Sequence, residues 1–388
     1  MSSNSNVQDI VLVFDPVLKF EKLFGILRFR VRNDKLQLID MSMILLSISI
    51  MLLHLIVFIV YSFGFFGFAS FVGSLKSIPS ISVLINYIIT VLFNCFWMRE
   101  DNVNIITLFA DLDAKLRLNV NRNVYNKIRK HFVWGLALIL FYNVEILFFC
   151  LVIKMLDNRL TVINNLLQNI GYSKVGKLFL RNTAWNSLYG NKIKISGGFM
   201  YIPPSDLHEL SLAYEKVGKL CQLINNVFNF QMFTCLITTF TTILVVVWIL
   251  LDLLHQKIAL SGMIAVGAWA FIHLCYVISM SLVCEGLLKT RNDTKCRVNH
   301  LVMNYDLPTS ARAKAKAFMK LIDAWPLRIQ VYNVLTVDIS LIFSLTGVCT
   351  TYLIVLIQIL HYIYKNLLLL ENSQKNIKLS RNSTLKLS

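Results

Sequence analysis

Polar side chains interrupt an apolar run near the C-terminus, residues 339–364. Thr351 and Tyr352 are adjacent, and Gln358 follows in the same run. Residues seven apart lie on nearly the same face of a helix, so Thr351 and Gln358 project together, with Val355 between them. Several copies of this face around one axis would form rings of hydroxyls and amides that replace the hydration shell of an ion, while apolar rings close a pore by dewetting. The alternative is that these groups form hydrogen bonds to neighbouring helices, worth about 1 kcal/mol each.

The composition indicates an integral membrane protein. Of the 388 residues, 56% are hydrophobic and only 15% are charged, and the mean hydropathy is +0.63. A soluble domain of this length needs more polar surface. The N-terminal segment mixes acidic and basic residues and lacks the apolar core of a cleaved signal peptide, so the first membrane span is expected to direct insertion.

Six stretches are apolar and long enough to cross the hydrocarbon core as helices, which takes about 20 residues. They are 41–61, 81–98, 131–154, 231–254, 259–284 and 339–364. The predicted fold class is therefore an all-α, polytopic membrane protein. Amphipathic stretches at about 205–230 and 309–335 predict helices that extend from the membrane into the cytoplasm and anchor the spans there.

Basic residues gather between the spans, which is typical of cytoplasmic loops. The net charge of the chain is +17. The bases crowd four segments that we therefore expect to lie inside the cell: 1–40, 99–130, 154–230 and 285–333. In this interpretation residues 41–364 form the transmembrane domain, and the polar, basic tail 365–388 is disordered.

The count of six spans conflicts with this charge pattern. Two segments on the same side of the membrane require an even number of crossings between them. Segments 99–130 and 154–230 are both expected inside, but only one span, 131–154, lies between them. Either a weak second crossing is hidden in 144–167, or the basic charge of 154–230 does not mark a cytoplasmic segment. We favour the hidden crossing, which gives seven helices, a cytoplasmic N-terminus and an extracellular C-terminus.

Several function classes lack support in the sequence. The eight cysteines are scattered and show neither a C-x-x-C pair nor Cys/His metal-ligand spacing. The few intramembrane His, Asp and Glu residues have no catalytic spacing, so no enzyme activity, metal or cofactor is expected. The positive charge lies between membrane spans, so we expect no nucleic-acid partner.

The C-terminal run resembles the signature of insect gustatory receptors, a Thr-Tyr followed by five hydrophobic residues and then Gln-Phe in the last helix. Thr351, Tyr352, the five residues 353–357 and Gln358 match this signature, and Ile359 replaces the usual Phe. Weaker agreements extend the resemblance over most of the chain: "PVLKFEKLFGILRF", "LFADLDAKL", "LSLAYEKVGKLCQLINNVFNFQ" and "PLRIQVYNVLTVDISLIFSLTGVCTTY".

The resemblance implies seven helices and a tetrameric, ligand-gated, non-selective cation channel whose pore is lined by the last helix of each subunit. The pore and gate residues would be Thr351, Tyr352, Val355, Gln358 and Ile359. The implied partners are a small-molecule tastant, permeant cations, membrane lipids and related receptor subunits in a homo- or hetero-tetramer. The implied location is the plasma membrane of a sensory neuron. Family members separate their third and fourth helices by an extracellular loop, and the chain departs from the family there.

The tastant and the function class have alternatives. The family's sugar-receptor branch tends to carry Glu at the position of Gln358, which favours a bitter compound, whereas the fructose-type branch keeps Gln and stays possible. A G-protein-coupled receptor would need an extracellular N-terminus with Asp-Arg-Tyr and Asn-Pro-x-x-Tyr signatures, which the sequence lacks. A secondary transporter would need repeated halves, and none is found.

A ligand pocket would use aromatic and hydrogen-bonding side chains in the outer halves of the spans. In the predicted topology these are Tyr87, Tyr142, Glu145, Trp248, Asp252, Trp269 and His273. Trp269 and His273 are the best pair, because residues four apart share one helical face. The alternatives are an interfacial aromatic belt for Trp248, a solvated loop edge for Asp252, and ordinary packing for Trp269 and His273.

Two carboxylates near the membrane also need partners. Glu145 lies inside an apolar span, where an unpaired charge is costly; ligand contact, an ion pair and a protonated acid are all open. Asp338 begins the last helix and is expected to pair with a cytoplasmic base. The alternative for Asp338 is to attract cations at the inner exit of the pore.

Overall fold

The computed structural model describes residues 2–32, 35–65, 71–116, 144–180, 207–256 and 260–384. Most of these residues are helical, which confirms the predicted all-α class. The helices are α1 (Ser2–Leu23), α2 (Met41–Phe65), α3 (Phe71–Leu92), the π-helix η1 (Phe93–Trp97), α4 (Arg99–Lys115), α6 (Val144–Leu180), α7 (Leu207–Gln256), α8 (Leu260–Met303), α9 (Thr309–Ala324) and α10 (Ile339–Thr384). Two small antiparallel hairpins pair β1 (Arg30–Arg32) with β2 (Lys35–Gln37) and β3 (Gln330–Val331) with β4 (Leu335–Thr336).

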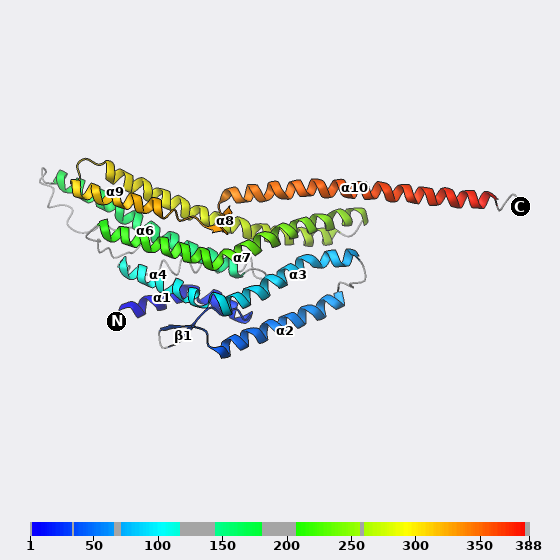
Figure 1. The fold of residues 1–388 in the computed structure, drawn as a ribbon, viewed down its shortest axis with the longest axis horizontal. Coiled ribbons are helices and arrows are strands. Elements are labelled where there is room, and N and C mark those ends of the chain that lie inside the picture. Colours follow the sequence, from blue (N-terminus) through cyan, green and yellow to red (C-terminus); the bar gives the residue numbers. More distant parts are fainter. Residues whose placement is uncertain are drawn as a thin grey trace.

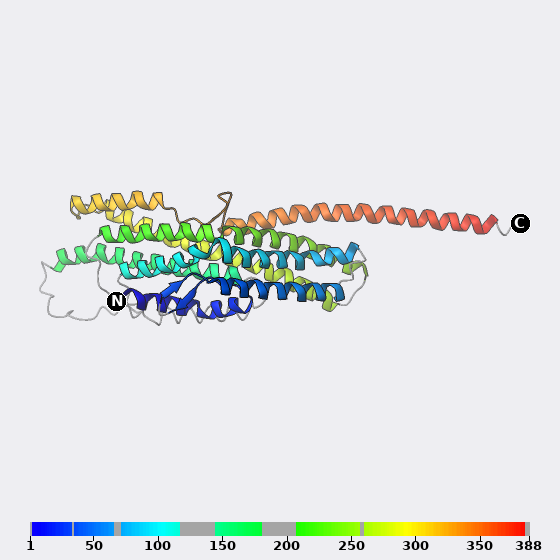
Figure 2. The same cartoon turned by 60° about the horizontal axis from the view of Figure 1, so that its bottom comes forward.

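The helices run roughly side by side along the long axis of the molecule (Figure 1). α1, α4, α6, α9, the start of α7 and the end of α8 gather at one end, which we call the packed end. α2, α3, the last part of α7 and the first part of α8 form the other end, which we call the apolar end. α10 begins near the middle and continues past the apolar end to the C-terminus, as Figure 2 also shows.

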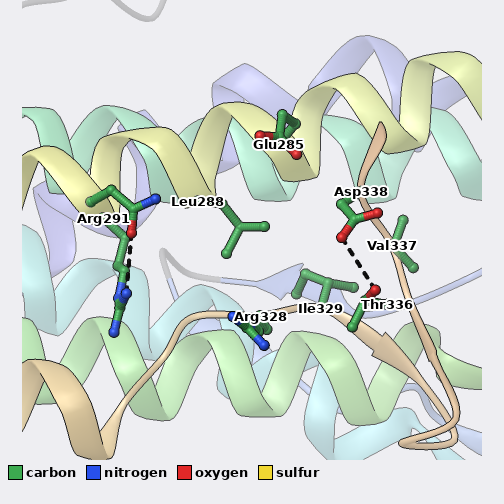
Figure 3. A pocket seen from close by; sticks show the side chains of 9 residues that line it. Glu285, Leu288, Arg291, Arg328, Ile329, Thr336, Val337 and Asp338 are labelled. Atoms are coloured by element: carbon green, nitrogen blue, oxygen red, sulfur yellow. Dashed lines mark hydrogen bonds between the residues drawn. The ribbon is translucent and has the colours of Figure 1, made fainter. Parts of the chain in front are cut away.

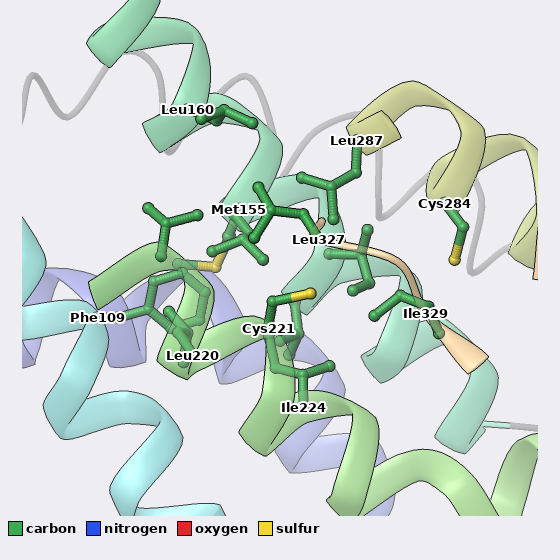
Figure 4. Packing of buried hydrophobic residues seen from close by; sticks show 14 of the residues in the cluster. Phe109, Met155, Leu160, Leu220, Cys221, Ile224, Cys284, Leu287, Leu327 and Ile329 are labelled. Carbon is green, nitrogen blue, oxygen red and sulfur yellow. The ribbon is translucent and has the colours of Figure 1, made fainter. Parts of the chain in front are cut away.

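A continuous hydrophobic core fills the packed end. α6 packs against α7 and α8, α1 packs against α4, and α9 packs against α8 and α7. Burying one large apolar side chain contributes about 1.5–3 kcal/mol, so this end is stabilised as a soluble helix bundle is. The labelled side chains in the centre of this core (Figure 4) are Phe109, Met155, Leu160, Leu220, Cys221, Ile224, Cys284, Leu287, Leu327 and Ile329.

The apolar end is buried far less. Only 17% of the most apolar stretch of α2 and 11% of that of α10 are buried. Leu53 of α2 is 60% exposed and Phe343 of α10 is 73% exposed. Soluble monomers rarely expose apolar surface on this scale, so these faces suit lipid or other protein chains.

Four helices in the described part of the chain are long and apolar enough to cross a membrane: Met41–Val60, Leu207–Ile249, Gly267–Met303 and Ile339–Ile359. They correspond to the predicted spans 41–61, 231–254, 259–284 and 339–364. The predicted span 81–98 occupies the end of α3 and η1. It qualifies as a fifth span only together with α4, across a bend of 73°. The bend directly follows η1, and single π-helical turns often mark such irregularities.

Residues 144–167 differ from the prediction of a hidden second crossing. They belong to one continuous helix, α6, and contain neither Gly nor Pro to break it. Two of their charged residues, including a base of the segment expected to be cytoplasmic, are bonded to other helices. Asp157 accepts a hydrogen bond from Thr290 of α8 at 2.6 Å, and Arg159 binds Asp113 of α4. The first part of the predicted span 131–154 lies outside the described residues.

The predicted helix 309–335 is shorter than expected. α9 stops before Pro326, which lacks an amide hydrogen and disfavours helical backbone in the residue before it. Tyr332 and Asn333 then adopt positive φ angles of 50° and 57° and turn the chain into the β3–β4 hairpin. The backbone amides of this segment donate to side chains of α7, as Gln330 does to Asn225 at 2.8 Å.

α10 is longer than the predicted last span. Residues 365–384, expected to belong to a disordered tail, continue the helix. After Gly347 the chain contains neither Gly nor Pro up to Thr384, so no helix-breaking residue interrupts it. At 1.5 Å per residue, 46 residues extend about 69 Å, which is roughly twice the thickness of the hydrocarbon core.

A buried charged cluster around Arg28 joins α1, η1, α4 and α6 at the bend between α3 and α4. Arg28 is 1% exposed and donates two hydrogen bonds of 2.9 Å to the two carboxylate oxygens of Glu21 in α1. It also donates to Glu145 of α6. A third guanidinium nitrogen donates to the side-chain oxygens of Asn94 in η1 and Asn102 in α4, each at 3.2 Å.

Two carboxylates share one guanidinium in this Arg28 cluster, so one negative charge is in excess. Burial raises the pKa of Glu21 from 4.5 to about 7; Arg28 opposes this rise and Glu145 adds to it. The folded protein therefore binds a proton at Glu21 more tightly than the unfolded chain does. The resulting stability is complete below pH 4.5 and is lost as the pH rises through about 7.

A second buried ion pair connects α4 to α6. Arg159 donates through Nε and Nη2 to the two carboxylate oxygens of Asp113, at 3.0 and 2.9 Å. This bidentate geometry is the stronger form of an arginine–carboxylate contact. Together with the Arg28 cluster, the pair fixes α6 against α4 by charge as well as by apolar packing.

We predict that Arg28→Met destabilises the protein by about 3–5 kcal/mol, because it leaves two buried carboxylates without their cation. Glu21→Gln should be tolerated near neutral pH, because the amide keeps an acceptor for Arg28 and removes the excess charge. The wild-type protein should lose stability between about pH 5 and about pH 7, by up to about 1.4 kcal/mol per pH unit, and Glu21→Gln should flatten this slope.

Thermal unfolding of the purified full chain in detergent at several pH values measures both effects. Lys19→Gln is the matched control, because the Lys19 side chain is 75% exposed on the same helix. A pH slope in Glu21→Gln equal to that of the wild type would show that another group titrates.

Candidate functional site

α10 carries the five side chains predicted to form a pore and gate: Thr351, Tyr352, Val355, Gln358 and Ile359. All five are exposed in the single chain, with Tyr352 at 52%, Val355 at 44% and Ile359 at 47%. α10 packs on α7 and α8, and apart from one ring contact of Tyr352 with α7 these contacts leave the motif exposed. The polar and apolar residues of the motif are therefore available to other subunits or to a water-filled pore.

The threonine hydroxyls of this region are bonded within α10 itself. Thr350 donates to the carbonyl of Thr346 at 2.8 Å, and Thr351 donates to that of Gly347 at 3.0 Å. Within the described ranges neither hydroxyl bonds to another helix, which gives no support to a role in joining helices. A hydroxyl that donates to its own backbone still presents oxygen lone pairs outward.

Tyr352 connects α10 to α7. Its ring packs edge-on against Phe240, with 5.4 Å between the ring centroids. Successive helix residues are about 100° apart, so this contact fixes the rotation of α10 while the neighbouring Thr351 stays exposed.

Two of the seven predicted ligand residues lie together in α8. The rings of Trp269 and His273 have centroids 6.1 Å apart, and His273 is 1% exposed. Neither the indole nitrogen of Trp269 nor either ring nitrogen of His273 has a hydrogen-bond partner among the described residues. Because buried polar groups are normally hydrogen-bonded, this pair has unused hydrogen-bonding capacity in an aromatic environment.

The other predicted ligand residues are dispersed. Tyr87 of α3 donates its hydroxyl to the carbonyl of Phe24 at 2.7 Å, and Glu145 belongs to the Arg28 cluster. Both were expected in the outer halves of spans, and the structure instead bonds them to the segment between α1 and α2. Trp248 is half-buried in α7. Tyr142 and the side chain of Asp252 lie outside the described residues.

Asp338 caps α10 and forms no ion pair with a base of the described chain. Its carboxylate accepts hydrogen bonds from the backbone amide of Ser340 at 2.9 Å, from the Ser340 hydroxyl, and from the Thr336 hydroxyl at 3.2 Å. These bonds, the one from the Ser340 hydroxyl most of all, hold the pKa of Asp338 below its ordinary value. An aspartate at this position satisfies a free amide of the first helical turn, so it fixes where α10 begins.

Sequence reasoning missed most of the Arg28 cluster. Glu145 was recognised as a carboxylate that needs a partner, but Arg28 was counted among the many bases before the first span. Asn94 and Asn102 drew no attention, because a lone amide in an apolar or amphipathic stretch has many uses. The available signal was the placement of Glu21 and Arg28 among closely spaced apolar residues.

Comparison with known proteins identifies the family. The pattern described as 7tm chemosensory receptor matches residues 131–359, which is more than half of the chain. Among solved structures, the insect olfactory receptor OR5 from Machilis hrabei matches with a TM-score of 0.54 and 12% sequence identity, covering 91% of this chain and 100% of that chain. That likeness concerns the fold alone, and no curated protein matches the sequence. With its helices of membrane-spanning length and the family pattern over more than half its residues, the chain belongs to the 7tm chemosensory receptor family.

Proposed function

We propose that this chain is a subunit of a gustatory receptor, a non-selective cation channel opened by a small tastant in the plasma membrane of a sensory neuron. Members of the chemosensory receptor family are ligand-gated cation channels. The run from Thr351 to Gln358 resembles the signature of the gustatory branch. The observation that carries the proposal is the exposure of this run on a membrane-length helix, which suits four copies of α10 around a pore.

The chemistry of such a pore follows from the spacing of the motif. Thr351 and Gln358 would form two polar rings about 10.5 Å apart along the axis, and their oxygens can replace part of a cation's hydration shell. Val355 and Ile359 would form apolar rings that close the pore by dewetting. Tyr352, packed on α7, would transmit a movement of α7 to this gate.

A bitter compound is the tastant that we favour. The Trp269–His273 pair supports an apolar, aromatic ligand with a hydrogen-bonding group. The ring faces supply contact area, and hydrogen bonds to the unpartnered nitrogens would orient the ligand. A fructose-type sugar receptor is the second candidate, because the chain keeps Gln358 where that branch also has Gln.

Whole-cell recording tests the proposal in cells that express this chain alone and in cells that co-express related subunits. Bitter compounds and sugars are applied while surface delivery is measured in parallel. A ligand-evoked cation current from the chain alone supports a homomeric channel, and one that requires co-expression supports a heteromer. Silence in both cases at full surface delivery would count against a channel.

We predict that Gln358→Ala changes single-channel conductance or cation selectivity at least twofold while surface expression stays the same, because the substitution removes a ring of amide oxygens from the pore. Thr346→Ala is the control, since Thr346 is exposed on α10 but lies about 120° around the helix from Gln358. Equal effects of the two substitutions on permeation would remove Gln358 from the pore lining.

We also predict that Trp269→Ala raises the ligand concentration for half-maximal current about tenfold, which corresponds to about 1.4 kcal/mol of lost contact. Phe271→Ala removes an aromatic ring two residues away that is 65% exposed, and it should leave the dose–response unchanged. If only the maximal current falls in Trp269→Ala, the residue serves packing and not ligand contact.

A further inference from the structure

A small pocket lies where α8, the β3–β4 segment and the start of α10 meet (Figure 3). Its volume is about 270 Å³, below the range of about 300–1,000 Å³ typical of pockets for drug-sized ligands. It therefore suits a compact chemical group. The lining residues are Glu285, Leu288, Arg291, Asn292, Arg328, Ile329, Thr336, Val337 and Asp338.

The pocket is lined by equal numbers of acidic and basic side chains, which lie on different sides of it. Arg291 and Arg328 are basic, while Glu285 and Asp338 are acidic, so the formal charge of the lining is zero. Figure 3 shows Leu288 between the side of Arg291 and the side of Asp338. A ligand that fits both sides must carry a negative and a positive group of its own.

Part of this charged lining is unused within the described chain. Arg328 and Glu285 have no hydrogen-bond or ion-pair partner among the described residues. Arg291 donates through its two terminal nitrogens to Asn292 and to the carbonyl of Ile322. One of these nitrogens also lies 4.0 Å from the carboxylate of Asp323, but the Nε atom is buried without a partner. A buried N–H donor without a hydrogen-bond partner costs free energy. The arrangement therefore offers guanidinium donors to an anion and a free carboxylate to a cation.

The pocket lies beside apolar stretches of two helices that are long enough to cross a membrane. Glu285 directly follows the apolar run that ends at Cys284, and Asp338 directly precedes the apolar part of α10. Exposed apolar side chains of α10, such as Phe343 at 73%, continue from the pocket along the span. A molecule with a charged head in the pocket can lay an apolar tail along this surface.

We propose that this pocket binds a zwitterionic phosphate–amine group, with the phosphate at Arg291 and Arg328 and the ammonium at Glu285. Planar guanidinium groups match phosphate oxygens, and an ammonium with N–H bonds can donate to a carboxylate. Asp338 adds negative potential although its oxygens already cap α10. The group can be the headgroup of phosphatidylethanolamine or free phosphoethanolamine. Its binding would tie α8 to the segment between α9 and β3.

Native mass spectrometry of the delipidated full chain in detergent tests the proposal with three lipids of identical acyl chains. Phosphatidylethanolamine should bind at least tenfold more tightly than phosphatidylcholine, whose quaternary ammonium has no N–H donor, and than phosphatidylglycerol, which has no cation. Glu285→Gln should remove this preference, and Arg328→Gln should weaken the binding of all three lipids, because all three carry the phosphate. Lys320→Gln, an exposed base on α9, should leave it intact.

Free phosphoethanolamine distinguishes the two sources of the group. If it displaces the lipid and alone raises the unfolding temperature as much as the lipid does, the pocket takes the soluble molecule. If it does neither at millimolar concentration while the lipid preference holds, the acyl chains are part of the site. Equal binding of the three lipids, tighter binding of phosphatidylglycerol, an undiminished preference in folded Glu285→Gln, or unchanged lipid affinity in folded Arg328→Gln would overturn the proposal.

Discussion

The buried guanidinium of Arg28 is the charge that constrains how the N-terminal segment, the bend after α3 and α6 come together. An arginine side chain cannot give up its proton under any physiological condition, so its burial requires oxygen ligands from the protein. Here they come from Glu21, Glu145, Asn94 and Asn102, each on a different element. Those elements can separate only by exposing the charge or leaving it unpaired, and this cost makes their arrangement specific.

The membrane-length helices depend on this cluster and on the core beside it. α2 and α10 bury little of their own apolar surface, whereas α7 and α8 run without a break from the packed end into the apolar end. The two long helices are therefore held by side chains that pack outside the most apolar part of the molecule. A displacement within the apolar end can reach the packed end through the helices themselves, and α10 is connected to that displacement through Tyr352 and Phe240.

Hydropathy and periodicity predicted the helices whose formation depends on local sequence. They located four spans and the amphipathic stretch that continues into one of them as α7, because both signals lie within about 20 consecutive residues. They failed for side chains whose surroundings depend on a partner that is distant in the sequence. Arg159 was counted among the bases of a cytoplasmic segment, yet its partner Asp113 lies 46 residues away. The pocket beside α10 was missed for the same reason, since α8 and the β3–β4 segment supply its charges jointly.

The candidate pore motif was recognised from a short pattern, but its exposure needed the structure. An amide in contact with hydrocarbon has no partner, and an unsatisfied polar group there costs several kcal/mol. Gln358 is exposed and has no hydrogen-bond partner in the described part of the chain, so lipid is an unfavourable neighbour for it. The Asp338 cap fixes where α10 starts and the Tyr352 contact fixes its rotation. The chain thus directs Gln358 away from its own bundle, where only water or another polar surface satisfies the amide, and this favours an assembly of several subunits around an aqueous path.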